Sequence, residues 1–182
     1  MISEVEFRRC ASMFVTGVTI VTTVGREGGF AGLTANSFTT VSLNPPLILF
    51  CLGKASTQYA AFVDCEGFAV HVASAGQRDL AARFATRGED RFAGLEVEMG
   101  AFGAPIIPGA LAVFECERYK TYDSGDHTVF VGLVHKTRLG DSKPRVALGY
   151  FQSHFIEIAL DDMAADTITD TPVSRLAAES AP

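Results

Sequence analysis

The stretch LAVFECERYKTYDSGDHTVFVGLVHK, residues 111–136, decides the fold class. Its first half alternates along an extended chain, so that Phe114 and Cys116 face one side and the residues between them face the other. The polar turn Asp123-Ser-Gly-Asp126 then leads into a second run, His127–Lys136, which is rich in β-branched and aromatic residues. Two such runs around a glycine-containing turn predict a long, half-buried antiparallel hairpin.

Further strands are predicted on the N-terminal and C-terminal sides of this hairpin. The β-branched run Gly17–Val24 and the segment Phe30–Leu43 flank the turn Arg26–Gly29, which predicts a second hairpin. The pair Pro45-Pro46 ends that segment, and the continuous apolar run Leu47–Leu52 has the length of a buried strand. Two more strands are predicted, at Gly67–Ala73 and at Leu148–Leu160.

Helices are few. Ser3 and Glu6 stand at capping-box spacing and predict an amphipathic helix over Ser3–Phe14, while shorter helices are predicted at Ser56–Cys65 and Gly76–Thr86. A doubly wound nucleotide fold is disfavoured, because no G-x-G-x-x-G turn and no G-x-x-x-x-G-K-[ST] loop occurs. We therefore predict a mainly β fold, a barrel or sandwich with helices covering its ends.

The composition is that of a single globular domain, with 182 residues, 48% of them hydrophobic, and a formal net charge of −6. This acidic balance argues against nucleic acid as a partner, because such binding needs Lys and Arg to neutralise phosphates. The longest apolar stretch, Pro45–Gly53, is too short to cross a bilayer, so we expect no membrane segment and no export signal. Four cysteines without a C-x-x-C pair predict buried thiols in a cytoplasmic protein.

Three polar segments carry residues that suit a nucleotide. In Gly32–Thr40 small side chains expose the backbone to a flat heterocycle, although an ordinary edge strand with Ser and Thr facing water is the alternative. Cys51–Thr57 places Lys54 and two hydroxyls around a glycine, which indicates either a phosphate cradle or a helix cap with a solvated lysine. Arg83–Arg91 holds three arginines that either clamp a phosphate or complement a helix dipole.

His127 is the candidate for contact with a second ligand. It follows the turn at Gly125-Asp126, so its imidazole can project beyond the sheet and donate a hydrogen bond to a carboxamide or phosphate; a local pair with the aspartate is the alternative. The four histidines are scattered and no spacing such as H-E-x-x-H occurs, so we predict no metal site. A G-x-S-x-G nucleophile elbow is also absent from the sequence.

Taken together, segments between about Phe7 and Phe155 resemble the short-chain flavin reductases, which are FMN-binding split-barrel reductase components of two-component monooxygenases. The resemblance lies in the order and spacing of these segments more than in any one of them. They are Gly17-Val-Thr-Ile-Val-Thr, Gly32-Leu-Thr-Ala-Asn-Ser-Phe, Val41-Ser-Leu-Asn-Pro-Pro-Leu, Gly67-Phe-Ala-Val, Arg83-Phe-Ala, Asp90-Arg-Phe-Ala-Gly, Ala104-Pro-Ile-Ile and Gly125-Asp-His-Thr-Val-Phe-Val-Gly.

The resemblance implies an antiparallel, Greek-key split barrel that binds FMN or FAD. By this resemblance the isoalloxazine would contact backbone groups of Thr34, Ala35, Asn36 and Ser37, its pocket would be lined by Ser42, Cys51 and Leu52, and the ribityl phosphate would be held by Lys54, Ser56 and Thr57. The phosphate side would be completed by Arg83, Phe84, Ala85 and Arg91, and the dinucleotide would be received by His127, near the nicotinamide, and by Tyr150, Phe151, Gln152 and Ser153.

The resemblance also implies an activity: NADH or NADPH would reduce the flavin by hydride transfer, and a homodimer would supply the reduced flavin to a partner monooxygenase. Gln152 and His154 depart from the residues common in the family, so the choice between NADH and NADPH stays open. Two alternatives also stay open, namely an oxidase or ferric reductase that keeps its FMN, and a non-catalytic flavin- or haem-binding module. We expect one domain over residues 1–160 and a flexible tail over residues 161–182.

Overall fold

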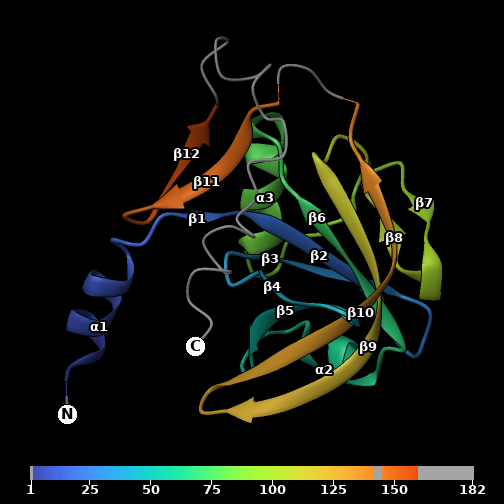
Figure 1. The fold of residues 1–182 in the computed structure, drawn as a ribbon, viewed down its shortest axis with the longest axis horizontal. Helices are drawn as coiled ribbons and strands as arrows, with labels where there is room; N and C mark the ends of the chain where they lie inside the picture. Colours follow the sequence, from blue (N-terminus) through green and yellow to red (C-terminus); the bar gives the residue numbers. More distant parts are fainter. Residues whose placement is uncertain (1, 142–144, 160–182) are drawn as a thin grey trace.

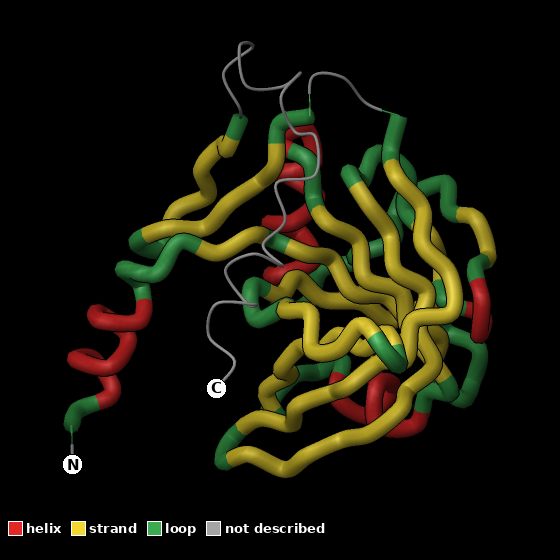
Figure 2. Tube along the Cα trace, viewed as in Figure 1, coloured by secondary structure: helices red, strands yellow, loops and turns green. Residues whose placement is uncertain are grey.

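The main sheet of the computed structural model is antiparallel and has the strand order β3-β2-β6-β9-β10-β5-β4 (Figures 1 and 2). The structure describes residues 2–141 and 145–159. The sheet curls until β3 lies close to β5, without a ladder between these two strands. The mainly β, split-barrel fold that the sequence predicts is thereby confirmed. Its strands are β2 (Thr19–Val24), β3 (Phe30–Ala35), β4 (Thr39–Leu43), β5 (Pro46–Gly53), β6 (Gly67–Val72), β9 (Ala112–Ser124) and β10 (His127–Leu139).

The long hairpin predicted at residues 111–136 is present as β9 and β10. Its pairing runs from Leu139 opposite Ala112 to His127 opposite Ser124, with two register shifts on the way. The turn consists of Gly125 and Asp126, and Gly125 adopts a positive φ of 62°, which glycine reaches without steric cost. In Figure 1 the half of this hairpin next to the turn lies along the lower side of the molecule, and its tip extends beyond the neighbouring strands.

A smaller three-stranded sheet stands beside the barrel and consists of β1 (Thr16–Gly17), β11 (Ala147–Phe151) and β12 (His154–Ile158). The single strand predicted at Leu148–Leu160 is wrong in this respect, because the chain reverses at Gln152 and Ser153, both with positive φ. The segment Phe30–Leu43 likewise forms two strands and not one, since residues 36–38 leave the sheet between β3 and β4. Two short strands, β7 (Glu98–Met99) and β8 (Pro105–Ile106), pair with each other.

The helices lie at the periphery (Figure 2). The capping box of Ser3 and Glu6 is present and opens α1 (Glu4–Ala11), yet no residue of α1 is buried, and the helix projects away from the barrel. The other helical segments are short: α2 (Tyr59–Asp64), η1 (Ala75–Gln77), α3 (Arg78–Ala85) and η2 (Ala101–Gly103). No helix among the described residues is long and apolar enough to cross a membrane.

Aromatic side chains fill the barrel. Phe50 stacks on Phe130 at 5.3 Å between ring centroids and meets Phe62 and Phe68 edge-on, and all four rings are fully buried. The run Leu47–Leu52 is not continuously buried as predicted, because alternate residues turn their side chains away from this core. Cys51 is one of these residues. Strand β5 therefore turns one face to the aromatic core and leaves the side chains of the other face partly exposed.

Two buried polar groups connect distant segments. The Nδ1–H of His71 donates to the Ile20 carbonyl at 2.9 Å and its Nε2 accepts from the Ile107 N–H at 3.0 Å, so the ring is neutral; burial lowers its pKa to about 4. The alternation along β9 places Glu115 on the face opposite the barrel core, where it is nevertheless buried. Burial raises its pKa, but hydrogen bonds from the Ala101 N–H and from Arg138 outweigh that effect and lower it.

Candidate functional site

A cavity of about 460 Å³ opens at the rim of the barrel. It lies beside the ends of β3, β5 and α3. Its size lies in the range of small-molecule sites. The lining comes from three separate stretches of chain and from the start of β10, and no described residue of it carries a carboxylate. These residues are Leu33, Thr34, Ala35, Asn36, Ser37, Cys51, Leu52, Gly53, Ala55, Ser56, Thr57, Phe84, Ala85, Arg87, Arg91 and His127.

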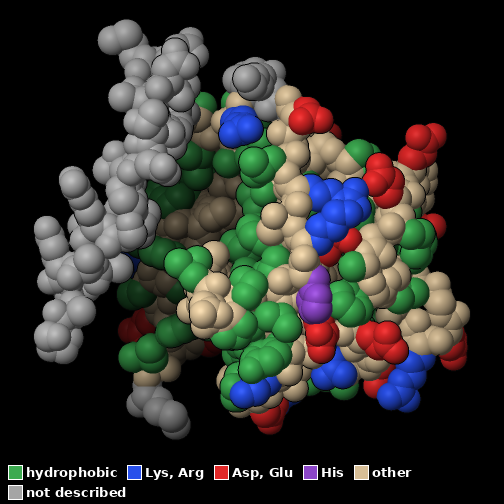
Figure 3. Space-filling view, turned by 45° about the vertical axis from the view of Figure 1, so that its right-hand side comes forward, with side chains coloured by type: hydrophobic (Ala, Val, Ile, Leu, Met, Phe, Trp, Pro, Cys, Tyr) green, Lys and Arg blue, Asp and Glu red, His purple; other side chains and the backbone are tan. Residues whose placement is uncertain are grey.

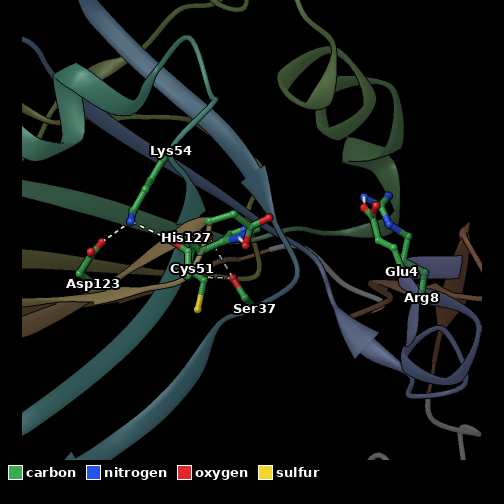
Figure 4. Close-up of polar contacts among 9 residues, drawn as sticks. Glu4, Arg8, Ser37, Cys51, Lys54, Asp123 and His127 are labelled. Atoms are coloured by element: carbon green, nitrogen blue, oxygen red, sulfur yellow. Dashed lines mark hydrogen bonds and ion pairs between the residues drawn. The ribbon is translucent and has the colours of Figure 1, made fainter. Parts of the chain in front are cut away.

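No ladder of backbone hydrogen bonds connects β3 with β5, but a side chain from the loop after β3 bonds to the backbone of β5. Ser37 Oγ accepts a hydrogen bond from the Cys51 N–H at 2.9 Å and donates to the Cys51 carbonyl at 3.3 Å (Figure 4). Thr39 is the β4 partner of Leu49, so Ser37 stands where the register would place a backbone partner for Cys51. The loop at residues 36–38 is thereby held against β5 while its backbone stays available to a ligand.

Two guanidinium groups occupy one end of the cavity. Arg91 donates from Nε to the Phe84 carbonyl at 3.0 Å and from Nη2 to the Thr86 carbonyl at 2.8 Å, and Arg87 donates from Nη2 to the Ala55 carbonyl at 2.8 Å. Burial lowers the pKa of Arg91, although a guanidinium stays protonated at neutral pH. The remaining N–H groups can receive an anion beside the hydroxyls of Ser56 and Thr57, a donor set that suits a phosphate.

His127 borders the same cavity at the start of β10. Its Nδ1 lies 2.8 Å from Asp126 Oδ1, and the hydrogen bond with His127 lowers the pKa of Asp126. The ring lies over Gly53, where a Cβ would be 3.4 Å from Nε2. Because the carboxylate occupies Nδ1–H, the Nε2 edge is the one left for a ligand.

Not every predicted site residue reaches the cavity. Lys54, Arg83 and Ser42 do not line it. The Lys54 ammonium contacts Asp123 and the Gly125 carbonyl, Arg83 donates from Nη1 to the Ala93 carbonyl at 2.9 Å, and Ser42 pairs with Leu47, at the opposite end of β5 from Gly53. All the other residues predicted for the flavin site are brought together there.

A second cavity of about 410 Å³ adjoins the first and shares Thr34, Asn36 and Ala85 with it. It is mostly apolar, and none of its described lining residues is charged; the others are Val18, Ala82, Tyr150, Ser153 and Phe155. Of the four residues predicted to receive a dinucleotide beside His127, Tyr150 and Ser153 line this cavity. Phe151 and Gln152 do not, and the Gln152 side chain instead turns toward Met13 Sδ at 3.2 Å.

Arg87 lines the cavity, although the phosphate contacts assigned from the sequence did not include it. Its signal was present, since the Arg83–Arg91 segment was singled out for its guanidinium groups, but nothing in the sequence says which of three arginines faces inward. The thiols are also not all buried as predicted: Cys10 is exposed and Cys51 half-buried, whereas burial raises the pKa of Cys65 and raises that of Cys116 to about 12. Within the described ranges no cluster of His, Cys, Asp and Glu could hold a metal ion.

The curled antiparallel sheet and the cavity at its rim, which is lined by two arginines, define a small barrel protein. Its cavity suits a flat ligand that carries a phosphate. The chain belongs to the flavin reductase like domain family, which matches residues 10–159. It is 46% identical over 139 residues to the FMN reductase (NADH) SmoA of Agrobacterium fabrum, covering 76% of this chain and 79% of SmoA.

Two further relatives extend the comparison. The chain is 36% identical over 172 residues to the reductase component of the flavin-dependent trigonelline monooxygenase of Acinetobacter baylyi; the match covers 94% of this chain and 54% of that protein, so this chain spans about half of that relative's length. The solved structure of the NADH:FAD oxidoreductase SgcE6 of Streptomyces globisporus, in complex with NAD and FAD fragments, superposes with a TM-score of 0.80 at 38% identity, covering 88% of this chain and 95% of that one.

Proposed function

We propose that this protein is an NADH-dependent flavin reductase that reduces FMN or FAD and supplies the reduced flavin to a partner monooxygenase. The observation that carries the proposal is the pair of adjoining cavities, one ending in two guanidinium groups and one apolar and uncharged. Hydride transfer needs two flat rings held at reactive distance, and two cavities with three shared wall residues provide adjacent places for them. The names of the relatives support the same activity.

The first cavity fits a flavin phosphate. A long, flat ring needs hydrogen-bond donors along one edge and a terminal phosphate needs cations, and the lining offers both in that order. Backbone groups of Thr34–Ser37 and of Cys51–Leu52 would meet the ring, and Ser56, Thr57, Arg87 and Arg91 would meet the phosphate. Phe84 and Ala85 would close the side between them.

The protein's own contribution is placement. A bound flavin would supply the chemistry of accepting a hydride. The residues would orient the reactants. The hydrogen bonds between Ser37 and Cys51 hold the loop that would contact the flavin ring, and His127 would present its Nε2 edge at the cavity. The buried Phe84 ring would keep water away from the flavin on its side of the cavity. Little acid or base work is expected of the side chains, because a hydride transfer between two bound rings moves no separate proton. Holding the rings at reactive distance converts the encounter into an effectively unimolecular step.

NADH is the proposed hydride donor, because the FMN reductase (NADH) SmoA and the NADH:FAD oxidoreductase SgcE6 are both named for it. In the second cavity Tyr150 and Phe155, whose rings meet edge to face at 5.5 Å, would offer an aromatic wall to its nicotinamide ring.

We also propose that the protein is a homodimer. The exposed helix α1 carries Val5 and Phe7 at exposures of 76% and 60%, and Phe14 just after it is 74% exposed. Figure 3 shows apolar side chains gathered over the middle of one face of the molecule. A second copy would cover such surface, because water-exposed apolar patches on stable chains commonly mark interfaces.

A cytoplasmic location is in keeping with the four free cysteines.

An anaerobic assay tests the function. NADH and NADPH are each supplied with FMN, FAD and riboflavin in turn, and oxidation of the dinucleotide is followed by its absorbance. We expect oxidation of NADH with FMN or FAD, and flavin that leaves the protein on gel filtration. Absence of dinucleotide oxidation under every combination would contradict the proposal, and a protein that stays yellow after the column would favour a resident FMN. Light scattering of the same sample tests the dimer.

A further inference from the structure

We propose that Lys54 is a positioning residue for His127, which it holds in place through the turn between β9 and β10, and that it does not bind the flavin phosphate. The inference rests on the proposed function for its kinetic consequence. The placement of the lysine itself is a matter of geometry.

Lys54 contacts the turn at three points (Figure 4). Its Nζ lies 2.5 Å from Asp123 Oδ1 and donates to the Gly125 carbonyl at 2.7 Å, and its backbone N–H donates to the Asp126 carbonyl at 2.9 Å. Lys54 directly follows the last residue of β5, Gly53, which pairs with His127. One residue therefore ties the end of β5 to both sides of the turn that precedes His127.

The turn needs such a tie. Residues 119–127 are all exposed, so the tip of this hairpin has no core beneath it that would fix its position. His127 is oriented by Asp126, and Asp126 is itself a turn residue. If the turn shifts, the carboxylate that holds Nδ1 shifts with it, and the Nε2 edge leaves the mouth of the cavity. Small misplacements of this kind reduce the rate of a reaction that depends on alignment.

The same contacts argue against a role of Lys54 in binding the flavin phosphate. Its ammonium is paired with the carboxylate of Asp123, which would repel a phosphate at that point. The cavity has its own cations in Arg87 and Arg91, and Lys54 is not among its lining residues. A lysine in the segment Cys51–Thr57 thus faces the hairpin, while the two hydroxyls beside it face the ligand.

The test compares Lys54→Met, Asp123→Ala, the double variant and Lys54→Arg, with Arg87→Gln as the variant that does address the phosphate. Three quantities are measured: the Kd for FMN and for riboflavin by flavin fluorescence, the KM and kcat for NADH, and the imidazole NMR signals of His127 without turnover. Circular dichroism and thermal unfolding check that each variant is folded.

We expect Lys54→Met and Asp123→Ala each to raise the KM for NADH roughly three- to tenfold and to shift the His127 signals, with the double variant no worse than either single one. Lys54→Arg should restore most of the loss, because it keeps a donor for Asp123. The Kd for FMN and for riboflavin should change less than about twofold.

A selective loss of FMN affinity in Lys54→Met, with riboflavin unaffected, would overturn the inference, because it would place the lysine at the phosphate. Unchanged His127 signals in both single variants would overturn it as well. If the wild-type protein oxidises no dinucleotide, the proposed function fails, yet the NMR and flavin-binding measurements still decide where Lys54 acts.

Discussion

Ser37 and Cys51 are joined by two hydrogen bonds through one hydroxyl, which takes the place of a strand ladder where the barrel is split. The arrangement leaves the backbone of the loop after β3 free on its cavity side. A side chain can do this where a strand cannot, because a strand would use its own N–H and C=O groups for pairing.

Replacing Ser37 with alanine should therefore weaken flavin binding. The Cys51 N–H loses its partner and the loop at residues 36–38 loses its tether, so we expect roughly a two- to tenfold rise in the flavin Kd. Thr39→Ala is the matched control, since among the described residues that hydroxyl donates just one hydrogen bond, an exposed one to the Thr40 carbonyl. Equal effects in the two variants would speak against the bridge.

His127→Ala should affect the dinucleotide more than the flavin. Removing the imidazole at the mouth of the cavity deletes the Nε2 edge, and we expect the KM for NADH to rise by about tenfold while the flavin Kd changes less. His135→Ala, on the same strand but paired with Glu117 and remote from the cavity, serves as the control. An unchanged KM and kcat for NADH would remove His127 from the site.

Arg87→Gln should distinguish flavins by their phosphate. Loss of a guanidinium facing an anion costs about 1.5–3 kcal/mol, so we expect the Kd for FMN to rise by at least about tenfold and that for riboflavin to stay nearly constant. Arg83→Gln controls for loss of charge, because that guanidinium donates to the Ala93 carbonyl outside the cavity. An equal loss of riboflavin affinity would mean that Arg87 supports the fold and not the phosphate.

Gly32→Ala should destabilise the protein through α3. A Cβ at this buried position would lie 2.6 Å from Cε1 of Phe84 and 3.1 Å from the Val21 carbonyl oxygen, so the buried Phe84 ring would have to shift toward the cavity that it lines. We expect a loss of about 1–3 kcal/mol in urea unfolding. Gly29→Ala, which meets nothing within 4 Å, should change stability little; an equally mild effect at Gly32 would refute the close contact.

His71 should make stability depend on pH. Its pKa is lowered from 6.5 to about 4 in the fold, so the unfolded chain takes up the proton first and stability falls as the pH drops below 6.5. The loss should reach on the order of 2 kcal/mol by about pH 5 and 3 kcal/mol by about pH 4.

Urea unfolding of the wild type and of His71→Asn across this range isolates the histidine, because the carboxylates titrate equally in both proteins. The variant should be less stable at neutral pH, where the Ile107 N–H and the Ile20 carbonyl lose their partner, but its stability should fall less steeply with acid. Parallel pH profiles would contradict the assignment.

Local patterns determined much of this molecule. The β9–β10 hairpin follows from alternation around a glycine turn, and the start of α1 follows from the spacing of Ser3 and Glu6, because these features depend on residues close together in the chain. The segments Gly32–Thr40 and Cys51–Thr57 were recognised as candidate ligand contacts for the same reason. The expected domain boundary at residue 160 stays a prediction, and the tail over residues 161–182 lies outside the described residues.

The tertiary structure alone decided which side chains act there. Periodicity places Glu115 on the face opposite Cys116, but its burial and its hydrogen bonds from the Ala101 N–H and from Arg138 are visible only in the fold. The sequence assigned Lys54, Arg83 and Arg91 to the phosphate, yet the described cations that face the cavity are Arg87 and Arg91, because Lys54 is held by Asp123 and Arg83 by the Ala93 carbonyl. The direction of a long, charged side chain is set by partners distant in the sequence, and no local pattern carries that information.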